Sequence, residues 1–190
     1  MTHHQPLQID AASGHLTQAR QVASPNYDAR PDGIAFDLIV VHGISLPPNE
    51  FGGSEIDQLF TNTLPWDAHP YFKQIEGLKA STHLLIRRDG ELVQYVSFKD
   101  RAWHAGASNY RGRERCNDFS IGIELEGADD LAYEPVQYRV LAETIGALCQ
   151  AYPSLARERV VGHSDIAPGR KTDPGEAFDW PRLRALIKSV

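Results

Sequence analysis

The clearest helical pattern in the chain stands between two short segments that read as strands. Apolar residues recur at helical spacing from about Pro135 to Tyr152, and a proline suits the first turn of a helix. The preceding segment, Phe119 to Leu125, alternates large apolar residues with small or polar ones, as a strand with one buried face does. A short strand is expected at Arg159 to Gly162. Strands interleaved with helices predict a mixed α/β domain in which helices pack on a sheet.

The first half of the chain fits the same class. Phe36 to His42 is short and β-branched, as a buried strand is expected to be. Thr82 to Arg88 and Glu91 to Val96 flank Asp89-Gly90, a pair typical of a two-residue hairpin turn. The stretch from Gly43 to Gly53 is rich in glycine and proline and is expected to be a loop.

Composition limits the domain count and the partners. The 190 residues are 42% hydrophobic and 23% charged, without repeats or a dividing linker, so we expect one domain over residues 1–190, acting as a monomer. A net charge of −6 argues against nucleic acid or an anionic membrane as the main partner, because both need a basic face. No secretory signal or lipid-anchor cysteine stands near the start, so a cytoplasmic location is expected, with Cys116 and Cys149 reduced.

Histidines near the ends of predicted strands are the first candidates for chemistry. His42, His83, His104 and His163 each end or interrupt an apolar segment. A single histidine of this kind is more often a hydrogen-bonded core residue than a metal ligand. His42 and His163 form a better case as a pair, because each follows a β-branched strand and precedes loop-forming residues, where a rigid scaffold presents site residues.

A hydrolytic metal site usually has three nitrogen or oxygen ligands and one open position. Asp173 is a possible third ligand. Lys171 lies two residues before it, so an extended backbone would point both side chains to the same side, and Pro174 favours extended geometry at Asp173. The alternative, a solvated turn, remains open from these residues alone.

Glu124 is a candidate general base. It stands within a strand between large apolar neighbours, where a carboxylate is costly to bury unless it is paired or functional. The alternative is an ordinary glutamate on a solvent-facing side of the sheet.

Two groups of motifs run along the chain from about Ala19 to Ile187. The first group is Val40-Val-His42, Ala102-Trp-His-Ala-Gly106, Asn117-Asp-Phe-Ser-Ile-Gly-Ile-Glu-Leu-Glu126, Gly162-His163 and Lys171-Thr-Asp-Pro-Gly175. The second group is Ile44-Ser-Leu-Pro-Pro48, Glu50-Phe-Gly-Gly53, Ala68-His-Pro-Tyr-Phe72 and Gly112-Arg-Glu-Arg-Cys-Asn117. Taken in order, the first group resembles the N-acetylmuramoyl-L-alanine amidases related to phage T7 lysozyme and the peptidoglycan recognition proteins. The second group resembles more narrowly the cytosolic members of that family that act on anhydro-muramoyl peptides in wall recycling.

The resemblance implies a mixed α/β fold with a mostly antiparallel or mixed sheet flanked by helices. It implies one zinc ion per chain and assigns a role to each matching residue. One departure is Gly43, which stands where close relatives often carry asparagine, so the contact of that amide to the sugar or lactyl group is not carried over. The implied zinc ligands are His42, His163 and Asp173, the catalytic pair is Glu124 and Lys171, and the residues near the muropeptide cleft are Trp103 and Arg115.

The expected function is therefore zinc-dependent hydrolysis of the amide between (1,6-anhydro-)N-acetylmuramic acid and L-alanine in small muropeptides. The alternative is a binding module of the same fold that recognises peptidoglycan without cutting it; such relatives usually lack the ligand at the position of Asp173. Since the ligand set and the catalytic pair are complete, catalysis is preferred. A nucleophilic role for Cys116 is disfavoured, because no histidine is paired with it in the sequence.

Overall fold

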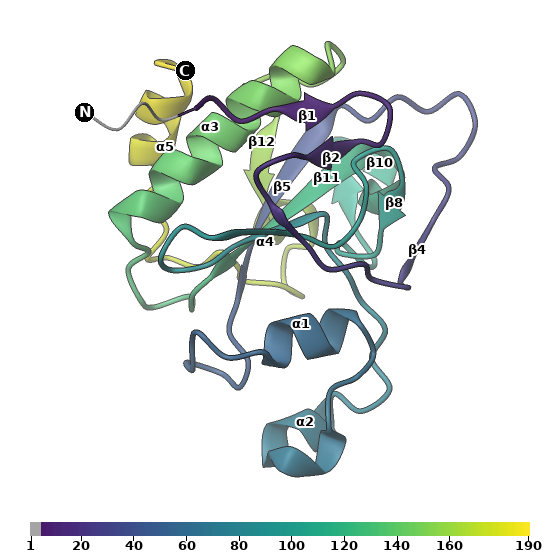
Figure 1. Ribbon diagram of the computed structural model, residues 1–190, viewed down its shortest axis with the longest axis vertical. Coiled ribbons are helices and arrows are strands. Elements are labelled where there is room, and N and C mark those ends of the chain that lie inside the picture. Colours follow the sequence, from purple (N-terminus) through teal and green to yellow (C-terminus); the bar gives the residue numbers. More distant parts are fainter. Residues whose placement is uncertain (1–4) are drawn as a thin grey trace.

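The computed structural model describes residues 5–190, and its centre is a six-stranded sheet in the order β12-β5-β11-β6-β7-β3 (Figure 1). The strands β5, β11 and β12, at one side of the sheet, pair in parallel, and so do β11 with β6 and β3 with β7. Only β6 and β7 are antiparallel within this sheet of the described chain. The strands are β3 (Arg20–Gln21), β5 (Leu38–Ile44), β6 (Leu84–Ile86), β7 (Leu92–Gln94), β11 (Ser120–Glu126) and β12 (Val160–Gly162).

The mixed sheet confirms the expected fold class, a mostly antiparallel or mixed sheet flanked by helices, and parallel pairing predominates within it. Parallel neighbours require long crossover connections, and here these contain helices. The segment between β5 and β6 contains α1 (Glu55–Phe60) and α2 (Pro70–Gln74), and α3 (Pro135–Ala151) connects β11 to β12. Helix α3 confirms the helix predicted from about Pro135.

The hairpin between β6 and β7 is confirmed, but its turn is longer than predicted. Ile86 pairs with Leu92, and the Arg87 amide donates to the Glu91 carbonyl at 2.9 Å. Residues 88–90 therefore form a three-residue connection. Gly90 closes it at a φ of 91°, a left-handed conformation that glycine adopts without a steric penalty.

The remaining elements are short. Helix α5 (Trp180–Ile187) follows Asp179, whose side chain accepts a hydrogen bond from the Arg182 amide and so caps the helix. The other elements are the pairs β1 (Ile9–Asp10) with β2 (His15–Leu16), β4 (Tyr27–Asp28) with β8 (Arg101–Ala102) and β9 (Asn109–Tyr110) with β10 (Arg113–Glu114), helix α4 (His163–Ile166), and the 3₁₀ turns Trp66–Ala68 and Cys116–Phe119.

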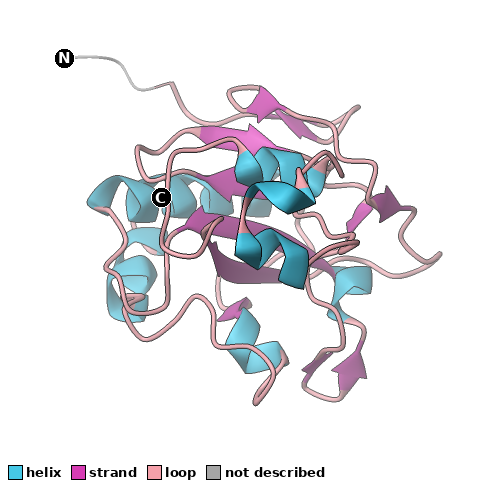
Figure 2. Cartoon of the chain, turned by 90° about the horizontal axis from the view of Figure 1, so that it is seen from below, coloured by secondary structure: helices cyan, strands magenta, loops and turns pink. Residues whose placement is uncertain are grey.

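The two faces of the sheet have different partners. On one face, Ile39, Ile121 and Ile123 pack in a core that also contains buried residues of α3 and α5. On the other face, Leu85 packs in a second core with residues of α1 and α2. Figures 1 and 2 show α3 and α5 on the opposite side of the sheet from α1 and α2. His42 and Glu124 alternate with the residues that face α3, so they project to the side of α1.

Two further expectations can be compared with the structure. Cys116 and Cys149 both lie in the described chain as free thiols, which agrees with the expected reduced state. Within residues 5–190, no helix is both long enough and apolar enough to cross a membrane.

Candidate metal centre and active site

Strand pairing brings distant residues of the sequence together. Glu124 on β11 lies opposite His42 on the parallel strand β5, and Gly162 at the end of β12 lies opposite Val41. His163, the next residue, begins α4 and so stands beside His42. These side chains gather at the carboxyl ends of parallel strands, where ligand sites of open α/β sheets commonly form.

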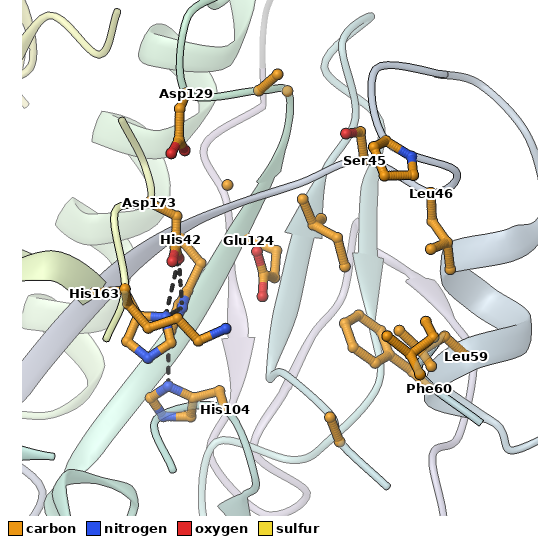
Figure 3. Close-up of a pocket in the computed structure, with 18 of the residues that line it drawn as sticks. His42, Ser45, Leu46, Leu59, Phe60, His104, Glu124, Asp129, His163 and Asp173 are labelled. Carbon is orange, nitrogen blue, oxygen red and sulfur yellow. Dashed lines mark hydrogen bonds and ion pairs between the residues drawn. The ribbon is translucent and has the colours of Figure 1, made fainter. Parts of the chain in front are cut away.

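Three donor atoms converge at this point (Figure 3). His42 Nδ1 and His163 Nδ1 are 3.0 Å apart, and Asp173 Oδ2 lies 3.0 Å from His163 Nδ1 and 3.3 Å from His42 Nδ1. Zinc bonds of about 2.0–2.1 Å in tetrahedral geometry separate two ligand atoms by about 3.3 Å. The three atoms therefore have the types and nearly the spacing of a three-ligand zinc site, so the structure brings the predicted ligands together.

The charges of these groups also suit a cation. Burial lowers the pKa of His42 to about 4, so its imidazole is neutral near pH 7. Burial alone would raise the pKa of Asp173, but the neighbouring imidazoles of His163 and His42 hold that pKa well below its usual value. A neutral imidazole and an ionised carboxylate thus direct lone pairs at the same point, as metal ligands do.

Glu124 points into the space beside these ligands (Figure 3). Burial, followed by the negative charge of Asp173, raises the pKa of its carboxyl group well above the usual value, while Lys171 lowers it. Its Oε2 atom is buried and has no hydrogen-bond partner within the described residues. A partly buried carboxyl group that faces a cavity with one buried, unpaired oxygen is expected of a residue that exchanges a proton.

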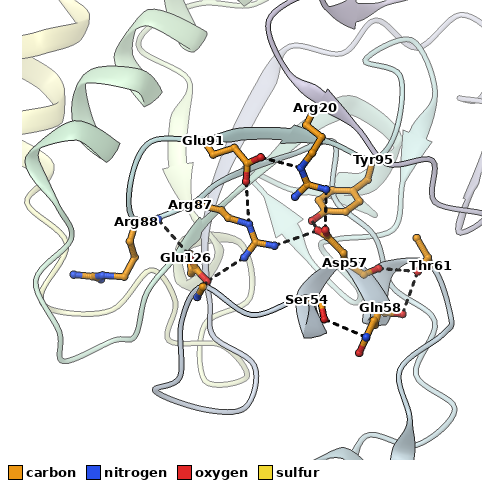
Figure 4. A network of polar contacts seen from close by, with 11 residues as sticks. Arg20, Ser54, Asp57, Gln58, Thr61, Arg87, Arg88, Glu91, Tyr95 and Glu126 are labelled. Atoms are coloured by element: carbon orange, nitrogen blue, oxygen red, sulfur yellow. Dashed lines mark hydrogen bonds and ion pairs between the residues drawn. The ribbon is translucent and has the colours of Figure 1, made fainter.

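Glu126, on the same strand face, has a different environment (Figure 4). Its carboxylate accepts hydrogen bonds from the backbone amides of Gly52 and Arg88 at 2.6 and 3.2 Å, and it pairs with the Arg87 guanidinium at 3.3 Å. These contacts fasten the 45–53 loop to the sheet. Of these two glutamates in the described chain, only Glu124 has a buried carboxyl oxygen without a hydrogen-bond partner.

The cavity in front of the ligands has a volume of about 530 Å³. Lys171 and Trp103, two of the candidate site residues, line it together with residues of the loop that follows β5. Leu46, Leu59 and Phe60 lie on the side of the cavity away from the metal centre, and Asp129 lies on the side of Asp173 (Figure 3). The apolar lining, called the apolar wall below, consists of Leu46, Leu59, Phe60, Tyr71, Ile75 and Leu78, and the acidic lining, called the acidic rim, consists of Asp129 and Asp130.

Arg115 is not among the described residues that line this cavity. Its side chain is 71% exposed, and its Nε atom lies 3.3 Å from the Asp118 carboxylate. Arg113, in the same segment, pairs with Asp37 and lies over the Phe119 ring. The segment 105–117 thus contributes no lining residue, whereas the loop after Gly43 does. A binding role for Arg115 stays a prediction.

Sequence reasoning missed the part that His104 plays. It was singled out with three other histidines but not assigned to the site, although it lines the cavity and its Nδ1 atom lies 2.9 Å from His42 Nε2. The available signal was its place in the Trp-His-Ala-Gly motif. The acidic rim and the apolar wall gave no such signal, because their residues come from distant segments.

Comparisons with known proteins identify the family to which the chain belongs. The family model for N-acetylmuramoyl-L-alanine amidase matches residues 32–176. The chain is 63% identical over 174 residues to the 1,6-anhydro-N-acetylmuramyl-L-alanine amidase AmpD of Salmonella typhimurium, which covers 92% of each protein. A crystal structure of a selenomethionine derivative of AmpD is 60% identical, with a TM-score of 0.91 over 94% of this chain and 98% of that one.

A structure of AmpDh3 from Pseudomonas aeruginosa in complex with anhydromuramic pentapeptide is more distant. It is 31% identical, with a TM-score of 0.59, over 82% of this chain and 61% of that one. The family match covers most of the sequence, and the AmpD relatives align along nearly all of it. The chain described here therefore belongs to the N-acetylmuramoyl-L-alanine amidase family.

Proposed function

We propose that this chain hydrolyses the amide bond between 1,6-anhydro-N-acetylmuramic acid and L-alanine, with zinc held by His42, His163 and Asp173. The observation that carries the proposal is the convergence of the three ligand atoms beside the unpaired carboxyl group of Glu124. The names of the AmpD relatives, and the peptide bound to AmpDh3, support the choice of substrate.

Amide hydrolysis near neutral pH needs an activated water, a polarised carbonyl group and a proton for the leaving nitrogen. A zinc ion held by His42, His163 and Asp173 would supply Lewis acidity, which lowers the pKa of bound water and polarises a carbonyl group. Glu124 takes a proton from the attacking water and delivers it to the alanine nitrogen as the bond breaks. Its raised pKa suits both steps, because the same carboxyl group must accept and then release a proton.

Lys171 lines the cavity close enough to Glu124 and His42 for its charge to affect both groups. Its ammonium group stabilises the negative oxygen of the tetrahedral intermediate. Loss of one such electrostatic donor typically lowers turnover by about 10²–10³-fold. Trp103 contributes to the cavity wall and positions the muropeptide.

The size of the cavity supports a small substrate. A volume of about 530 Å³, bounded on one side by the loop after β5, matches a fragment better than a glycan strand. We infer that the chain works in the cytoplasm on imported anhydro-muropeptides, as one zinc-bearing monomer in wall recycling, without nucleic acid or membrane as a partner.

The second candidate is a module that binds muropeptide without cutting it. Such a module has no need for an unpaired buried carboxyl group beside a complete set of ligands. Mass spectrometry of the products from a soluble anhydro-muramoyl peptide, with zinc analysis of the same sample, separates the two. Release of free peptide by a zinc-loaded protein supports the enzyme; tight binding without release would establish the module.

A further inference from the structure

Two consecutive residues, His104 and Ala105, contact both imidazoles of the candidate metal centre. The His104 ring meets His42 Nε2 at 2.9 Å, and the Ala105 carbonyl accepts from His163 Nε2 at 3.3 Å. In both histidines these nitrogens are the ones turned away from Asp173. The dipeptide therefore lies behind the metal centre and contacts the ring atoms that a metal at Nδ1 would leave free.

A chain of hydrogen bonds runs from His42 away from the metal centre. His104 Nδ1 faces His42, and His104 Nε2 lies 3.2 Å from the Ser120 hydroxyl oxygen. The Ser120 hydroxyl donates to the Cys116 carbonyl at 2.5 Å. This series of hydrogen bonds thus ends on a backbone oxygen, which can only accept a hydrogen bond.

The Cys116 carbonyl at the end of this series fixes which atom donates and which accepts in each of its hydrogen bonds. Because Ser120 gives its proton to the Cys116 carbonyl, its oxygen accepts from His104 Nε2–H. His104 Nδ1 then carries no proton and accepts from His42 Nε2–H. His42 is left with a bare Nδ1 directed at His163 and Asp173. This tautomer follows from the far end of the chain, without any assumption about a metal.

The dipeptide is itself firmly held. The Asn117 side-chain oxygen accepts from the amides of His104 and Ala105 at 3.1 and 2.8 Å. The Arg170 guanidinium donates to the Ala105 carbonyl at 2.6 Å. The His104 ring lies against Gly122, where an added Cβ would come within 2.4 Å of the ring, so only glycine leaves the ring in this place.

We propose that His104 is a positioning residue for the metal centre. Held by Ser120, His104 sets the tautomer of His42 that leaves Nδ1 free to bind the metal. The Ala105 carbonyl orients His163 in the same way. Partners of this kind typically change metal affinity by about 10–100-fold when they are removed. The inference rests on the proposed zinc site, but the tautomer itself is a property of the metal-free protein.

The first test is therefore made without metal. Nitrogen-15 NMR of the histidine rings in zinc-free protein at pH 7.5 reports which nitrogen of His42 carries the proton. We expect the proton on Nε2 in the wild type, and a mixture of tautomers in Ser120→Ala, where His104 loses its fixed acceptor. A wild-type His42 protonated on Nδ1 would overturn the proposal.

The second test measures zinc affinity by competition with a chelator, using two replacements of His104. His104→Phe keeps a ring but removes the acceptor, and we expect zinc affinity to fall about 10–100-fold. His104→Asn places an oxygen where Nδ1 stood, and we expect it to recover most of the lost affinity. Equal affinity in His104→Phe and the wild type would overturn the proposal.

Circular dichroism and the melting temperature of each zinc-free variant show whether it folds. If His104→Phe does not fold, the tautomer measurement on the wild type and Ser120→Ala still decides whether His104 sets the tautomer of His42. A wild type with the expected tautomer but no zinc would overturn the proposed function and the metal-binding role of His104 together. If the wild type binds zinc and the His104 variants bind it with the same affinity, only the role of His104 is overturned.

Discussion

Glu124 lies in register with His42 across the parallel strands β11 and β5, yet the Oε2 atom of its carboxyl group has no hydrogen-bond partner in the described chain. Burying a carboxyl group without a partner costs free energy, and the raised pKa of Glu124 expresses that cost. Glu126, two residues along the same strand, is fully engaged by the 45–53 loop and Arg87. One strand thus carries a carboxyl group with an unpaired oxygen at the cavity and a second carboxylate that is engaged in structural contacts.

The first prediction compares these two glutamates. Glu124→Gln keeps the shape of the side chain but removes the proton acceptor, so we expect kcat to fall by about 10²–10⁴-fold while zinc content stays near that of the wild type. Glu126→Gln should lower the melting temperature and leave the turnover of the folded enzyme largely intact. Assays with zinc analysis and thermal melts check both. Wild-type turnover in Glu124→Gln would refute its role as base.

The second prediction concerns the metal. His163→Ala and Asp173→Ala each remove one of three ligands, so bound zinc should fall from about one per chain to nearly none, with loss of turnover. In the wild type, zinc at 100 times its Kd should stabilise the fold by about 2.7 kcal/mol, because it binds only the folded state. Melts with and without a chelator measure this, and full activity in a metal-free sample would contradict it.

The candidate site could be predicted from the sequence because its key residues stand at strand ends or within a strand. His42 and His163 follow β-branched runs, and Glu124 interrupts an alternating strand. The geometry that makes them a site is non-local: β5 lies between β11 and β12, and this order depends on crossover connections that no short motif encodes. For the same reason the role of His104 was missed, since its partners Ser120 and His42 are brought to it only by sheet pairing.

The third prediction is a pH dependence of stability that comes from His83. Burial, with the charge of Arg30, lowers its pKa to about 3, and its Nδ1 atom accepts from the Gly122 amide at 3.0 Å. The unfolded chain gains a proton on this residue below its ordinary pKa of 6.5, whereas the folded protein gains one only near pH 3. The free energy of unfolding should therefore fall as the pH drops from about 6.5 towards 3, by up to about 1.4 kcal/mol per pH unit.

His83→Asn provides the control for that dependence. Asparagine can accept a hydrogen bond from the Gly122 amide but does not titrate. The free energy of unfolding should therefore fall less steeply with decreasing pH in the variant than in the wild type. Urea unfolding of zinc-free protein at several pH values between 4 and 7 measures the two slopes. Equal slopes would show that His83 does not contribute to acid unfolding.

The fourth prediction concerns Arg115, which lies outside the cavity lining and is largely exposed. If the stem peptide extends beyond the cavity, its carboxylates can reach this guanidinium, an interaction that aids binding more than chemistry. Arg115→Ala should then raise KM several-fold with little change in kcat. Arg111→Ala, an exposed arginine in the same segment, is the matched control and should change neither constant. An unchanged KM in Arg115→Ala would remove it from the binding site.

The fifth prediction follows from the walls of the cavity. The loop after β5 supplies Ser45, Leu46 and Pro48 to one side, and its Gly52 amide is fastened to the sheet by Glu126. A wall held in this way admits a small muropeptide but obstructs a continuous glycan strand. We expect kcat/KM for a soluble anhydro-muropeptide to exceed that for polymeric peptidoglycan by at least about 10²-fold, roughly 3 kcal/mol of discrimination.

The same wall provides a variant that isolates its contribution. Glu126→Gln weakens the hydrogen bond to the Gly52 amide, so the loop should be held less tightly against the sheet. The ratio of kcat/KM for the soluble fragment to that for polymeric peptidoglycan should then decrease, mainly because kcat/KM for the polymer rises. Parallel assays on sacculi and on the fragment, with products identified by mass spectrometry, measure the ratio for both proteins. Comparable rates on the two substrates in the wild type would instead indicate an enzyme that remodels the intact wall, because an obstructing loop cannot coexist with efficient cleavage of a glycan-bound peptide.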